Sequence, residues 1–375
     1  MGHDFEITII GAGVCGLAVA AEISGGGREV CLVEKKESYG LETSSRNSEV
    51  IHSGIYYPQG TLKAGLCVRG KQLLYELCEK HGIPHRKLGK LVVASSREEI
   101  RELRELKENG QRNGVDDLIL IDRQELERLE PHVAGEAALL SPSTGIIDSH
   151  SLVRYFEQVA RRNDVTFSYN AEAVDLSPES GGYRIGIRQC GQAFSFLSRV
   201  VINCAGLRSD RIAAAAGIDI AKAGYRLHYS KGEYFSVLKR RQTLVNHLIY
   251  PVPQSDSGWL GVHITLDLQG QMKLGPSAED VGEIDYTVDP GHQEMFFAAA
   301  RKYLPHLASQ DLRPDTAGVR PKLAKEGEGF RDFVIRDETD KGLPGFIDLI
   351  GIESPGLTCS PAIAAYVANI VRNIL

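Results

Sequence analysis

The chain has 375 residues, of which 42% are hydrophobic and 25% are charged, and its formal net charge is −6 at pH 7. This length exceeds the size at which one hydrophobic core stops growing, so we expect two domains that share an interface. The negative charge provides no basic field for a polynucleotide, which argues against nucleic acid as the main partner and leaves small molecules as candidates.

The cysteine pattern and the hydropathy indicate the compartment. Seven cysteines are scattered along the chain without a Cys-x-x-Cys pair. They predict free thiols, with no disulfide framework and no metal site. The chain shows neither the pattern of a signal peptide nor an apolar run of the roughly 20 residues that cross a bilayer. We therefore expect a cytoplasmic protein without a transmembrane segment, and leave peripheral membrane contact open.

The first elements are a strand, a glycine turn and a helix. An apolar run at 7–10 precedes the sequence GAGVCG at 11–16, and an alanine-rich stretch follows at 17–23. A glycine trio at 25–27 ends this helix, and a second apolar strand at 30–33 ends at Glu34. This βαβ unit has the glycine spacing of a dinucleotide-binding site.

Each glycine of the turn has a separate predicted role. Gly11 permits the tight turn, Gly13 lets the backbone approach a pyrophosphate, and Gly16 allows the helix to pack closely on the strand. The N–H groups of Val14 and Cys15 lie at the helix start, where phosphate binds.

The acidic residue that ends the second strand completes this fingerprint. Glu34 is expected to hydrogen-bond the adenosine ribose, and Lys35 follows it in the predicted cofactor site.

Two short helices are expected in the next part of the chain. A charged segment between Ser95 and Gly110 predicts an exposed helix, and Asp122 is a predicted N-cap of a second helix at 124–130. We expect both helices to be insertions beside the nucleotide domain.

The second half of the chain predicts strands of both domains. Residues 199–206 indicate a buried strand and a glycine turn, followed by an alanine-rich helix to Ala216, all in the nucleotide domain. Residues 225–274 alternate in the manner of antiparallel strands and are assigned to a substrate domain. A last strand at 346–352 precedes a turn, and Ser360 and Pro361 are the predicted N-cap and first residue of a C-terminal helix.

The C-terminal turn favours FAD over NAD, two cofactors that share the glycine fingerprint. In large flavoprotein families, a glycine turn at this place brings backbone N–H groups to the O2 side of the flavin and stabilises the negative charge of the reduced ring. The sequence GIESPGLT at 351–358 has this composition. An NAD-linked dehydrogenase would leave the turn without a purpose.

Further segments resemble a known family. Residues 43–57 (TSSRNSEVIHSGIYY) and 62–70 (LKAGLCVRG) resemble the region of L-2-hydroxyglutarate dehydrogenases and glycerol-3-phosphate oxidases in which a serine–arginine turn meets the FAD pyrophosphate and a histidine stands by the flavin. Residues 231–235, 249–253 with 260–265, and 317–322 are similar to the same family. The chain thus resembles the L-2-hydroxyglutarate dehydrogenase/oxidase family, within the D-amino acid oxidase/glycine oxidase superfamily, over nearly its whole length.

The resemblance implies the fold and the rest of the cofactor site. It implies an α/β FAD-binding Rossmann-like domain with a doubly wound, mainly parallel sheet at 1–85, 146–222 and 324–375. An α+β substrate domain with a large, mostly antiparallel sheet is implied at 86–145 and 223–323. The implied cofactor contacts are Ser44, Ser45, Arg46, Asn47, His52, Ser53, Ala173, Val174, Cys204, Ala205, Gly206, Arg320, Gly351, Ser354, Pro355, Gly356, Leu357 and Thr358.

The expected reaction is FAD-dependent oxidation of a small anionic 2-hydroxy acid, with L-2-hydroxyglutarate to 2-oxoglutarate as the preferred case. It requires a base for the hydroxyl proton, flavin N5 for the hydride and a clamp for the carboxylate. His52 is the predicted base and His263 the alternative, as base or hydroxyl ligand. Arg320 is the predicted carboxylate ligand, because a guanidinium matches two oxygens, and Tyr250 and Lys231 are expected to complete the pocket.

Other functions remain open at the level of sequence. An amine oxidase acting on glycine or sarcosine would use the same fold and clamp, and a glycerol-3-phosphate oxidase-like enzyme shares the same segments. A catalytically silent FAD-binding protein is the alternative outside the enzymes. Oxygen, a quinone and an electron-transfer protein are all open as the electron acceptor.

Overall fold

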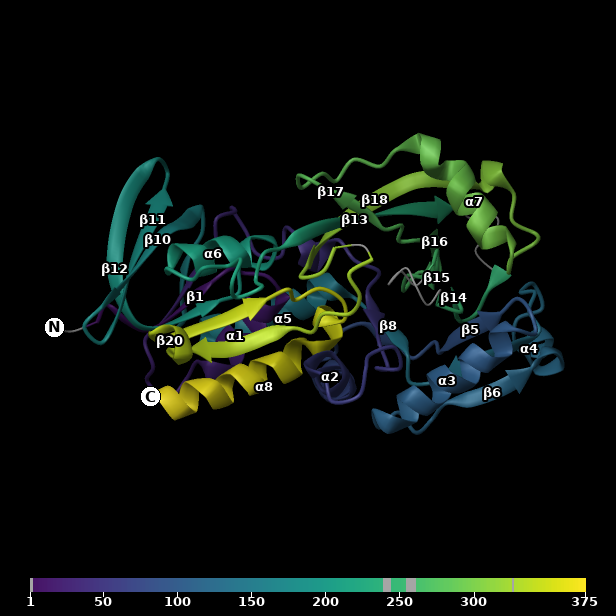
Figure 1. The fold of residues 1–375 in the computed structure, drawn as a ribbon, viewed down its shortest axis with the longest axis horizontal. Coiled ribbons are helices and arrows are strands. Elements are labelled where there is room, and N and C mark those ends of the chain that lie inside the picture. The colour runs from purple at the N-terminus through teal and green to yellow at the C-terminus, as the bar shows by residue number, and fades with distance from the viewer. Residues whose placement is uncertain (1–2, 239–243, 254–260, 326) are drawn as a thin grey trace.

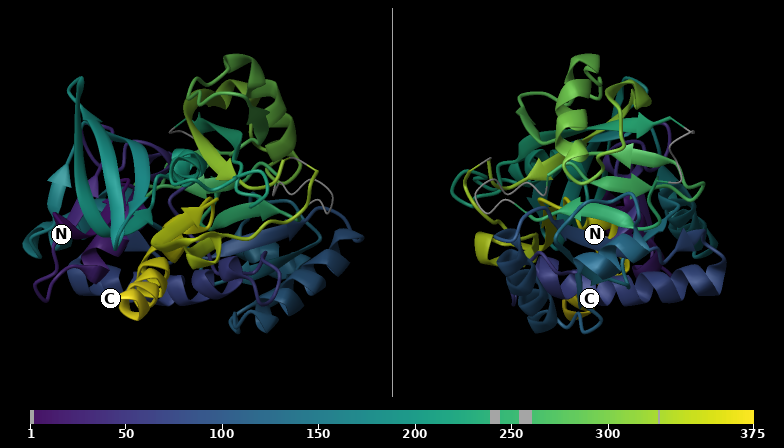
Figure 2. Two further views of the ribbon diagram at one scale, coloured as in Figure 1. Left: turned by 60° about the vertical axis from the view of Figure 1, so that its left-hand side comes forward. Right: turned by 90° about the vertical axis from the view of Figure 1, so that its right-hand side faces the viewer.

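The computed structural model describes residues 3–238, 244–253, 261–325 and 327–375, and Leu260 of the segment at 260–265 lies outside them. Figure 1 shows an elongated molecule with one large sheet towards each end and both termini at the end formed by the first sheet. In the left view of Figure 2, the long strands β10–β12 (teal) remain apart from the α7 segment (green).

The first sheet has the order β10-β11-β12-β1-β2-β9, and β20 extends it by pairing with β12 and β19. The pairs of β1 with β12 and β2, of β2 with β9 and of β12 with β20 are parallel, whereas the pairs of β10 with β11, of β11 with β12 and of β19 with β20 are antiparallel. The sheet is therefore mainly parallel, as expected. Its strands are β1 (Phe5–Ile10), β2 (Val30–Val33), β9 (Thr166–Ser168), β10 (Ala171–Glu179), β11 (Gly182–Gln189), β12 (Gln192–Asn203), β19 (Val334–Glu338) and β20 (Leu343–Ile350).

Helices cover both faces of the first sheet. On one face, α8 packs against α1 and α2, and α5 packs against α1, around a core that includes Leu17, Leu32 and Ile363. On the other face, α6 packs against β10 and β20. Both faces are thus buried, which explains the nearly continuous apolar runs in the parallel strands. These helices are α1 (Val14–Ile23), α2 (Leu62–His81), α5 (Ser149–Arg162), α6 (Ser209–Ala215) and α8 (Gly356–Ile374).

The C-terminal helix begins earlier than the sequence predicts. It begins at Gly356, and Pro361 lies inside it instead of at its first position. A proline inside a helix has no N–H for the carbonyl four residues before it. Here the Ser360 hydroxyl donates to the Leu357 carbonyl oxygen at 2.9 Å, so a side chain replaces the missing amide.

The second sheet has the order β17-β13-β16-β15-β14-β5-β7-β6, with β18 paired to β13. Only the pair of β14 with β5 is parallel among its described strand pairs, so the sheet is mostly antiparallel, as expected. Its strands are β5 (Lys90–Ala94), β6 (Ile119–Asp122), β7 (Ala137–Ser141), β13 (His228–Val237), β14 (Leu248–Pro251), β15 (Ile264–Leu266), β16 (Met272–Leu274), β17 (Glu279–Val281) and β18 (Leu312–Lys322).

The two predicted short helices and a further one belong with this second sheet. Helices α3 (Glu99–Arg112) and α4 (Arg123–Leu129) pack on β6 and β7, and α7 (Gln293–Arg301) packs on β18. Asp122 caps α4 by accepting a hydrogen bond from the Glu125 amide at 2.9 Å, as predicted.

A third, small sheet consists of β3 (Val50–Ile51), β8 (Gly145–Ile147) and β4 (His85–Arg86). Along the chain, its strands stand where the polypeptide passes from one large sheet to the other. The strands of each large sheet fall within the residue ranges predicted for the two domains, although the exact boundaries stay a prediction. Within the described ranges, every helix is too short or too polar to cross a bilayer.

Candidate active site

A cavity of about 1030 Å³ is lined by residues that the two large sheets and the chain ends contribute. It contains most of the predicted site residues. Those on its wall are Gly13, Val14, Cys15, Ser44, Arg46, Asn47, His52, Cys204, Gly206, Tyr250, His263, Arg320, Ser354, Pro355, Gly356 and Leu357.

The glycine turn at 11–16 brings the backbone of β1 close to its neighbours. Gly11 has φ +109°, and a Cβ there would lie 2.4 Å from the Cys204 carbonyl oxygen. A Cβ at Gly16 would lie 2.0 Å from the Gly11 carbonyl oxygen. Both contacts are far inside van der Waals distance, so only glycine fits at these two positions. Gly13 instead lines the cavity at the start of α1.

Glu34 lies at the end of β2 and supports the glycine turn. Its carboxylate accepts hydrogen bonds from the Ala12 amide at 2.8 Å and the Lys36 amide at 2.9 Å. Burial raises the pKa of Glu34, and these two amides act in the opposite direction. Each carboxylate oxygen keeps lone-pair capacity for a ribose hydroxyl.

The serine–arginine turn joins the glycine turn to the second sheet. Ser44 Oγ accepts a hydrogen bond from the Val14 amide at 2.9 Å, at the first residue of α1. The Arg46 guanidinium lies 4.1 Å above the Tyr286 ring, and its Nε is buried without a hydrogen-bond partner among the described residues. A Cβ at Gly318 of β18 would lie 2.2 Å from the Arg46 carbonyl oxygen. Gly318 therefore permits the turn to lie directly on the second sheet.

His52 is held against the C-terminal turn. Its amide donates to Thr358 Oγ1 at 3.0 Å, and the Thr358 hydroxyl donates to the Val50 carbonyl at 3.2 Å. Its Nε2 lies 3.4 Å from Ser354 Oγ, and its Nδ1 is buried without a described hydrogen-bond partner. Burial, and secondarily the charge of Lys90, lower the pKa of His52 to about 3. The imidazole is therefore neutral at pH 7, with one ring nitrogen unprotonated.

His263 and Tyr250 form a stacked pair on the cavity wall. Their ring centroids are 3.8 Å apart and the rings are inclined by 10°. Burial, and then the charges of Lys90 and Arg320, hold the pKa of His263 well below its usual value. His263 is thus also neutral, and its Nδ1 is buried without a partner in the described structure.

Arg320 lies on β18 opposite Ser230 of β13. A Cβ at Gly232 would lie 3.1 Å from Arg320 Nη2, so the absence of a side chain at 232 leaves room for the guanidinium. Ser230, Gly232 and Tyr234 share one face of β13, and all three line the cavity with Arg320. This face therefore belongs to the candidate substrate site.

Lys231 lies on the opposite face of the same strand. Its ammonium is 2.6 Å from Asp285 Oδ2 and 3.2 Å from Glu233 Oε1, and the residue is absent from the cavity wall. The structure corrects the expectation that Lys231 completes the substrate pocket. The residues before and after it face the cavity because strand side chains alternate.

Several predicted cofactor residues are absent from the wall of the cavity. Ser53 is hydrogen-bonded to Ser141, and Lys35 is paired with Glu42 at 2.8 Å. Ala173 and Val174 lie on β10, which begins with a hydrogen bond from the Ala171 amide to the Glu34 carbonyl at 2.9 Å. The remaining members of this group are Gly11, Gly16, Glu34, Ser45, Ala205, Gly351 and Thr358, and their direct contact with a cofactor stays a prediction.

The sequence did not single out three residues at or behind this site. Tyr56 and Tyr234 line the cavity, and Lys90 lies behind it. Tyr56 and Tyr234 stand in segments that carry the family resemblance, which was an available signal. Lys90 carried no signal, because a lysine at the start of a strand is usually exposed.

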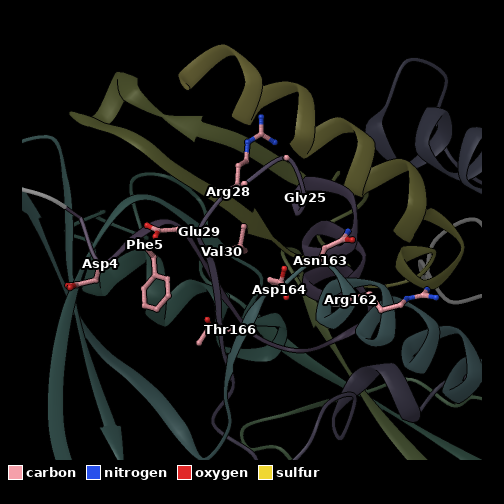
Figure 3. Close-up of a pocket in the computed structure, with 12 residues that line it drawn as sticks. Asp4, Phe5, Gly25, Arg28, Glu29, Val30, Arg162, Asn163, Asp164 and Thr166 are labelled. Atoms are coloured by element: carbon pink, nitrogen blue, oxygen red, sulfur yellow. The ribbon is translucent and has the colours of Figure 1, made fainter.

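A second hollow, of about 510 Å³, lies at the far end of the first sheet (Figure 3). Its wall includes Phe5 and Val30, the first residues of β1 and β2, together with Gly25 and Arg162. In parallel sheets, ligands bind at the carboxyl ends of the strands, where the glycine turn stands. This hollow is therefore not the nucleotide site.

The chemistry of the residues that line the large cavity fits the expected FAD. The starts of α1 and α8 both reach its wall, at Gly13–Cys15 and at Gly356–Leu357, and helix starts carry N–H groups without intrahelical partners. The Arg46 guanidinium, whose Nε is buried without a described partner, supplies a cation on the wall of the same cavity. Among the described residues, no cluster of histidine, cysteine, aspartate and glutamate has the geometry of a metal site.

Comparisons with known proteins agree with this arrangement. Residues 6–370 match the family model described as FAD dependent oxidoreductase. The chain is 39% identical to a mitochondrial L-2-hydroxyglutarate dehydrogenase of Arabidopsis thaliana, over 97% of this chain and 83% of that protein. It is 31% identical to a glycerol 3-phosphate dehydrogenase of Caloramator mitchellensis, over 99% of this chain and 74% of that protein. The dithionite-reduced, FAD-bound L-alpha-glycerophosphate oxidase of Mycoplasma pneumoniae superposes with a TM-score of 0.87 at 28% identity, over 98% of this chain and 94% of the other.

Proposed function

The chain belongs to the FAD dependent oxidoreductase family, and from this premise we propose that it oxidises L-2-hydroxyglutarate, or a closely similar 2-hydroxy acid, to the 2-oxo acid. The cofactor is FAD and the protein is an oxidoreductase, as the sequence predicted. The proposal concerns the substrate and the roles of the side chains around it.

The observation that carries the proposal is that two neutral histidines and an arginine share one cavity with the glycine turn. His52, His263 and Arg320 all line this cavity. Oxidation of a secondary alcohol needs a group that accepts the hydroxyl proton and a cation that holds the carboxylate. Bound FAD would supply the hydride acceptor, flavin N5.

His52 is proposed to take the hydroxyl proton. Its imidazole is neutral, so one ring nitrogen is unprotonated, and the hydrogen bond from its amide to Thr358 fixes the backbone that carries it. Ser354 Oγ, 3.4 Å from Nε2, is placed to orient the ring. His263, stacked on Tyr250, is proposed to hold the hydroxyl oxygen.

Arg320 is proposed to bind the carboxylate next to the hydroxyl carbon. Its fork matches two carboxylate oxygens, and Gly232 leaves it unobstructed. The neighbouring Tyr234 hydroxyl, hydrogen-bonded to Ser48 at 2.9 Å, offers a further polar contact at this wall. The similarity to an L-2-hydroxyglutarate dehydrogenase along nearly the whole chain supports this substrate class.

A glycerol phosphate is the second candidate substrate. The similarity to a glycerol 3-phosphate dehydrogenase and to an L-alpha-glycerophosphate oxidase favours it specifically. Such a substrate is also an anionic secondary alcohol, so the same histidine and arginine would serve it.

Anaerobic mixing of the purified yellow protein with single substrates tests the proposal. We expect L-2-hydroxyglutarate to bleach the flavin absorbance, whereas D-2-hydroxyglutarate, L-lactate and glycine leave it unchanged. Bleaching by glycerol 3-phosphate alone would select the second candidate, and bleaching by glycine or sarcosine alone would identify an amine oxidase. Persistent yellow colour with the whole series would contradict the proposed function.

A further inference from the structure

Lys90 is a buried cation that the proposed reaction leaves unexplained. It is the first residue of β5, between Leu248 of β14 and Ser141 of β7, and its relative exposure is 0%. Its ammonium lies 4.3 Å from the centroid of the Tyr56 ring and 4.8 Å from that of the Tyr250 ring. Within the described ranges, its Nζ has no hydrogen-bond partner.

The groups around Lys90 belong to the wall of the candidate active site. Tyr56 and Tyr250 line the cavity with their ring faces towards the ammonium, so Lys90 lies directly behind that wall. His52 and His263, also on the wall, both have their pKa lowered by the Lys90 charge, in addition to burial.

The titratable groups that face Lys90 from the packed elements carry no compensating charge. His52 and Tyr56 face it from the segment after β3, Tyr250 from β14, and His263 from the segment before β15. Burial raises the pKa of both tyrosines and lowers that of both histidines, so all four are neutral at pH 7.

One further group and one further cation complete this environment. The Cys67 thiol of α2 is the remaining group that acts on Lys90, and it favours the charged amine. Arg320 is a second cation within electrostatic reach of His263 and Tyr250. The described surroundings of Lys90 therefore hold positive charge without a carboxylate to balance it.

A buried ammonium without a partner is unfavourable, and such a group gives up its proton in preference. The two tyrosine faces offset part of this cost, since the face of an aromatic ring attracts a desolvated cation. Burial lowers the pKa of Lys90 to about 7, so the amine is close to half-protonated at neutral pH.

We propose that Lys90 is a positioning residue for an anionic substrate, which takes up a proton from solvent when the anion binds and supplies a positive charge behind the Tyr250–His263 pair. The inference rests on the proposed function for its substrate class. A hydroxy dicarboxylate brings two negative charges, and Arg320 matches one of them. The positive charge of Lys90 balances the second negative charge without contact with the substrate, because Tyr56 and Tyr250 lie between the ammonium and the cavity.

Linkage fixes the direction of the pH dependence. The anion favours the protonated amine, so the complex binds more protons than the free holoenzyme above pH 7. Affinity for the anion should then fall as the pH rises through the range 7–9. The proton moves from water to Nζ, and no covalent bond to the substrate forms or breaks.

The test is calorimetric titration of the oxidised holoenzyme with 2-oxoglutarate, which cannot reduce the flavin. At pH 8, titrations in phosphate and Tris, which differ in ionisation enthalpy, should reveal uptake of about 0.5 to 0.9 proton per site. The dissociation constant should rise by up to about tenfold between pH 7.5 and 8.5. This measurement uses the unaltered protein, so it decides the matter even if a variant does not fold.

Two variants and a control assign the proton. Lys90→Met should lose the uptake and the pH dependence and bind 2-oxoglutarate about tenfold more weakly at pH 6.5. Lys90→Arg, permanently charged, should restore the affinity without the uptake. Lys71→Met removes another buried lysine, whose ammonium is 2.8 Å from Ser143 Oγ and which is absent from the cavity wall, and it should behave as the parent.

The outcomes separate this inference from the proposed function. Binding without proton uptake in the parent, or uptake that persists in Lys90→Met, would overturn the role of Lys90. If no hydroxy acid bleaches the flavin in the mixing experiment, the proposed function fails irrespective of the calorimetry. Flavin bleaching by L-2-hydroxyglutarate without linked proton uptake would refute only the role of Lys90.

Discussion

The two sides of the cavity are built from different parts of the polypeptide. On the side of the first sheet, the backbone forms the wall, at the glycine turn and at the start of α8. On the side of the second sheet, side chains form it, chiefly Tyr250, His263 and Arg320. A backbone wall depends on glycines that no other residue can replace, whereas a side-chain wall can change its substrate and keep its fold. The backbone of the first side should therefore control cofactor binding, whereas the side chains of the second side, together with His52, should control substrate turnover.

The largest effect is expected at Gly11. Gly11→Ala should yield protein with little or no bound FAD, because the new Cβ would lie 2.4 Å from the Cys204 carbonyl oxygen at a φ of +109°. The ratio of flavin to protein absorbance measures the loss. Gly65→Ala on α2 is the control, since a Cβ there has no atom within 4 Å. A full complement of FAD in Gly11→Ala would contradict the claim that the backbone wall controls cofactor binding.

His52 should give the largest effect on turnover. His52→Asn removes the proposed base and should lower the rate of flavin reduction by about 10²- to 10⁴-fold, with FAD content preserved. Stopped-flow measurement of flavin bleaching provides the rate, and His150→Asn on the exposed surface is the control. A larger loss in His263→Asn than in His52→Asn would transfer the role of base to His263, and an unaffected rate in both variants would contradict alcohol oxidation.

A substitution of Arg320 tests whether the side-chain wall binds the substrate. Arg320→Leu should raise KM by about 10- to 100-fold, because a hydrogen-bonded charged pair contributes about 1.5–3 kcal/mol, while bound FAD stays unchanged. Steady-state kinetics measure the change, and Arg313→Leu, at the exposed start of the same strand, should leave KM unaltered. Loss of FAD in Arg320→Leu would mean that this arginine serves the cofactor side instead.

The smallest effect is expected at Ser360, whose hydroxyl replaces the missing Pro361 amide as the donor to the Leu357 carbonyl in α8. Ser360→Ala should destabilise the protein by about 1 kcal/mol, because the Leu357 carbonyl loses its donor. The same substitution should cost less in a Pro361→Ala background, where a backbone N–H is available again. Thermal unfolding of the four proteins gives this double-mutant cycle. Equal losses in the two backgrounds would show that the hydroxyl does not replace the proline amide.

Several elements were predicted well because their signals are local. The turn at Gly11–Gly16, the strand that ends at Glu34 and the capping by Asp122 depend on residues within a few positions of one another. Pro361 was misplaced for the same reason. Proline favours the first position of a helix, so Ser360 was predicted to be the N-cap. In the structure both residues lie inside the helix, and the Ser360 hydroxyl makes the hydrogen bond that the Pro361 amide cannot make.

The side chains of the substrate wall were harder to predict. His52, His263 and Arg320 were found through family resemblance, whereas Lys231 was assigned to the wrong face of β13 and Lys90 was not considered. A strand alternates its faces, so a single residue of error moves a side chain from the cavity to the far side.

The sequence by itself determined the nucleotide-binding unit, because a glycine turn and its flanking apolar runs constrain the backbone directly. The C-terminal turn and the family resemblance added the FAD cofactor, and the resemblance implied the mainly parallel sheet. Only the tertiary structure decided which face of β13 meets the cavity, and that Lys90 is buried behind Tyr56 and Tyr250. These features depend on the register and packing of segments far apart in the chain. Burial and distance, which set the charge of a histidine or a lysine, exist only after those segments have come together.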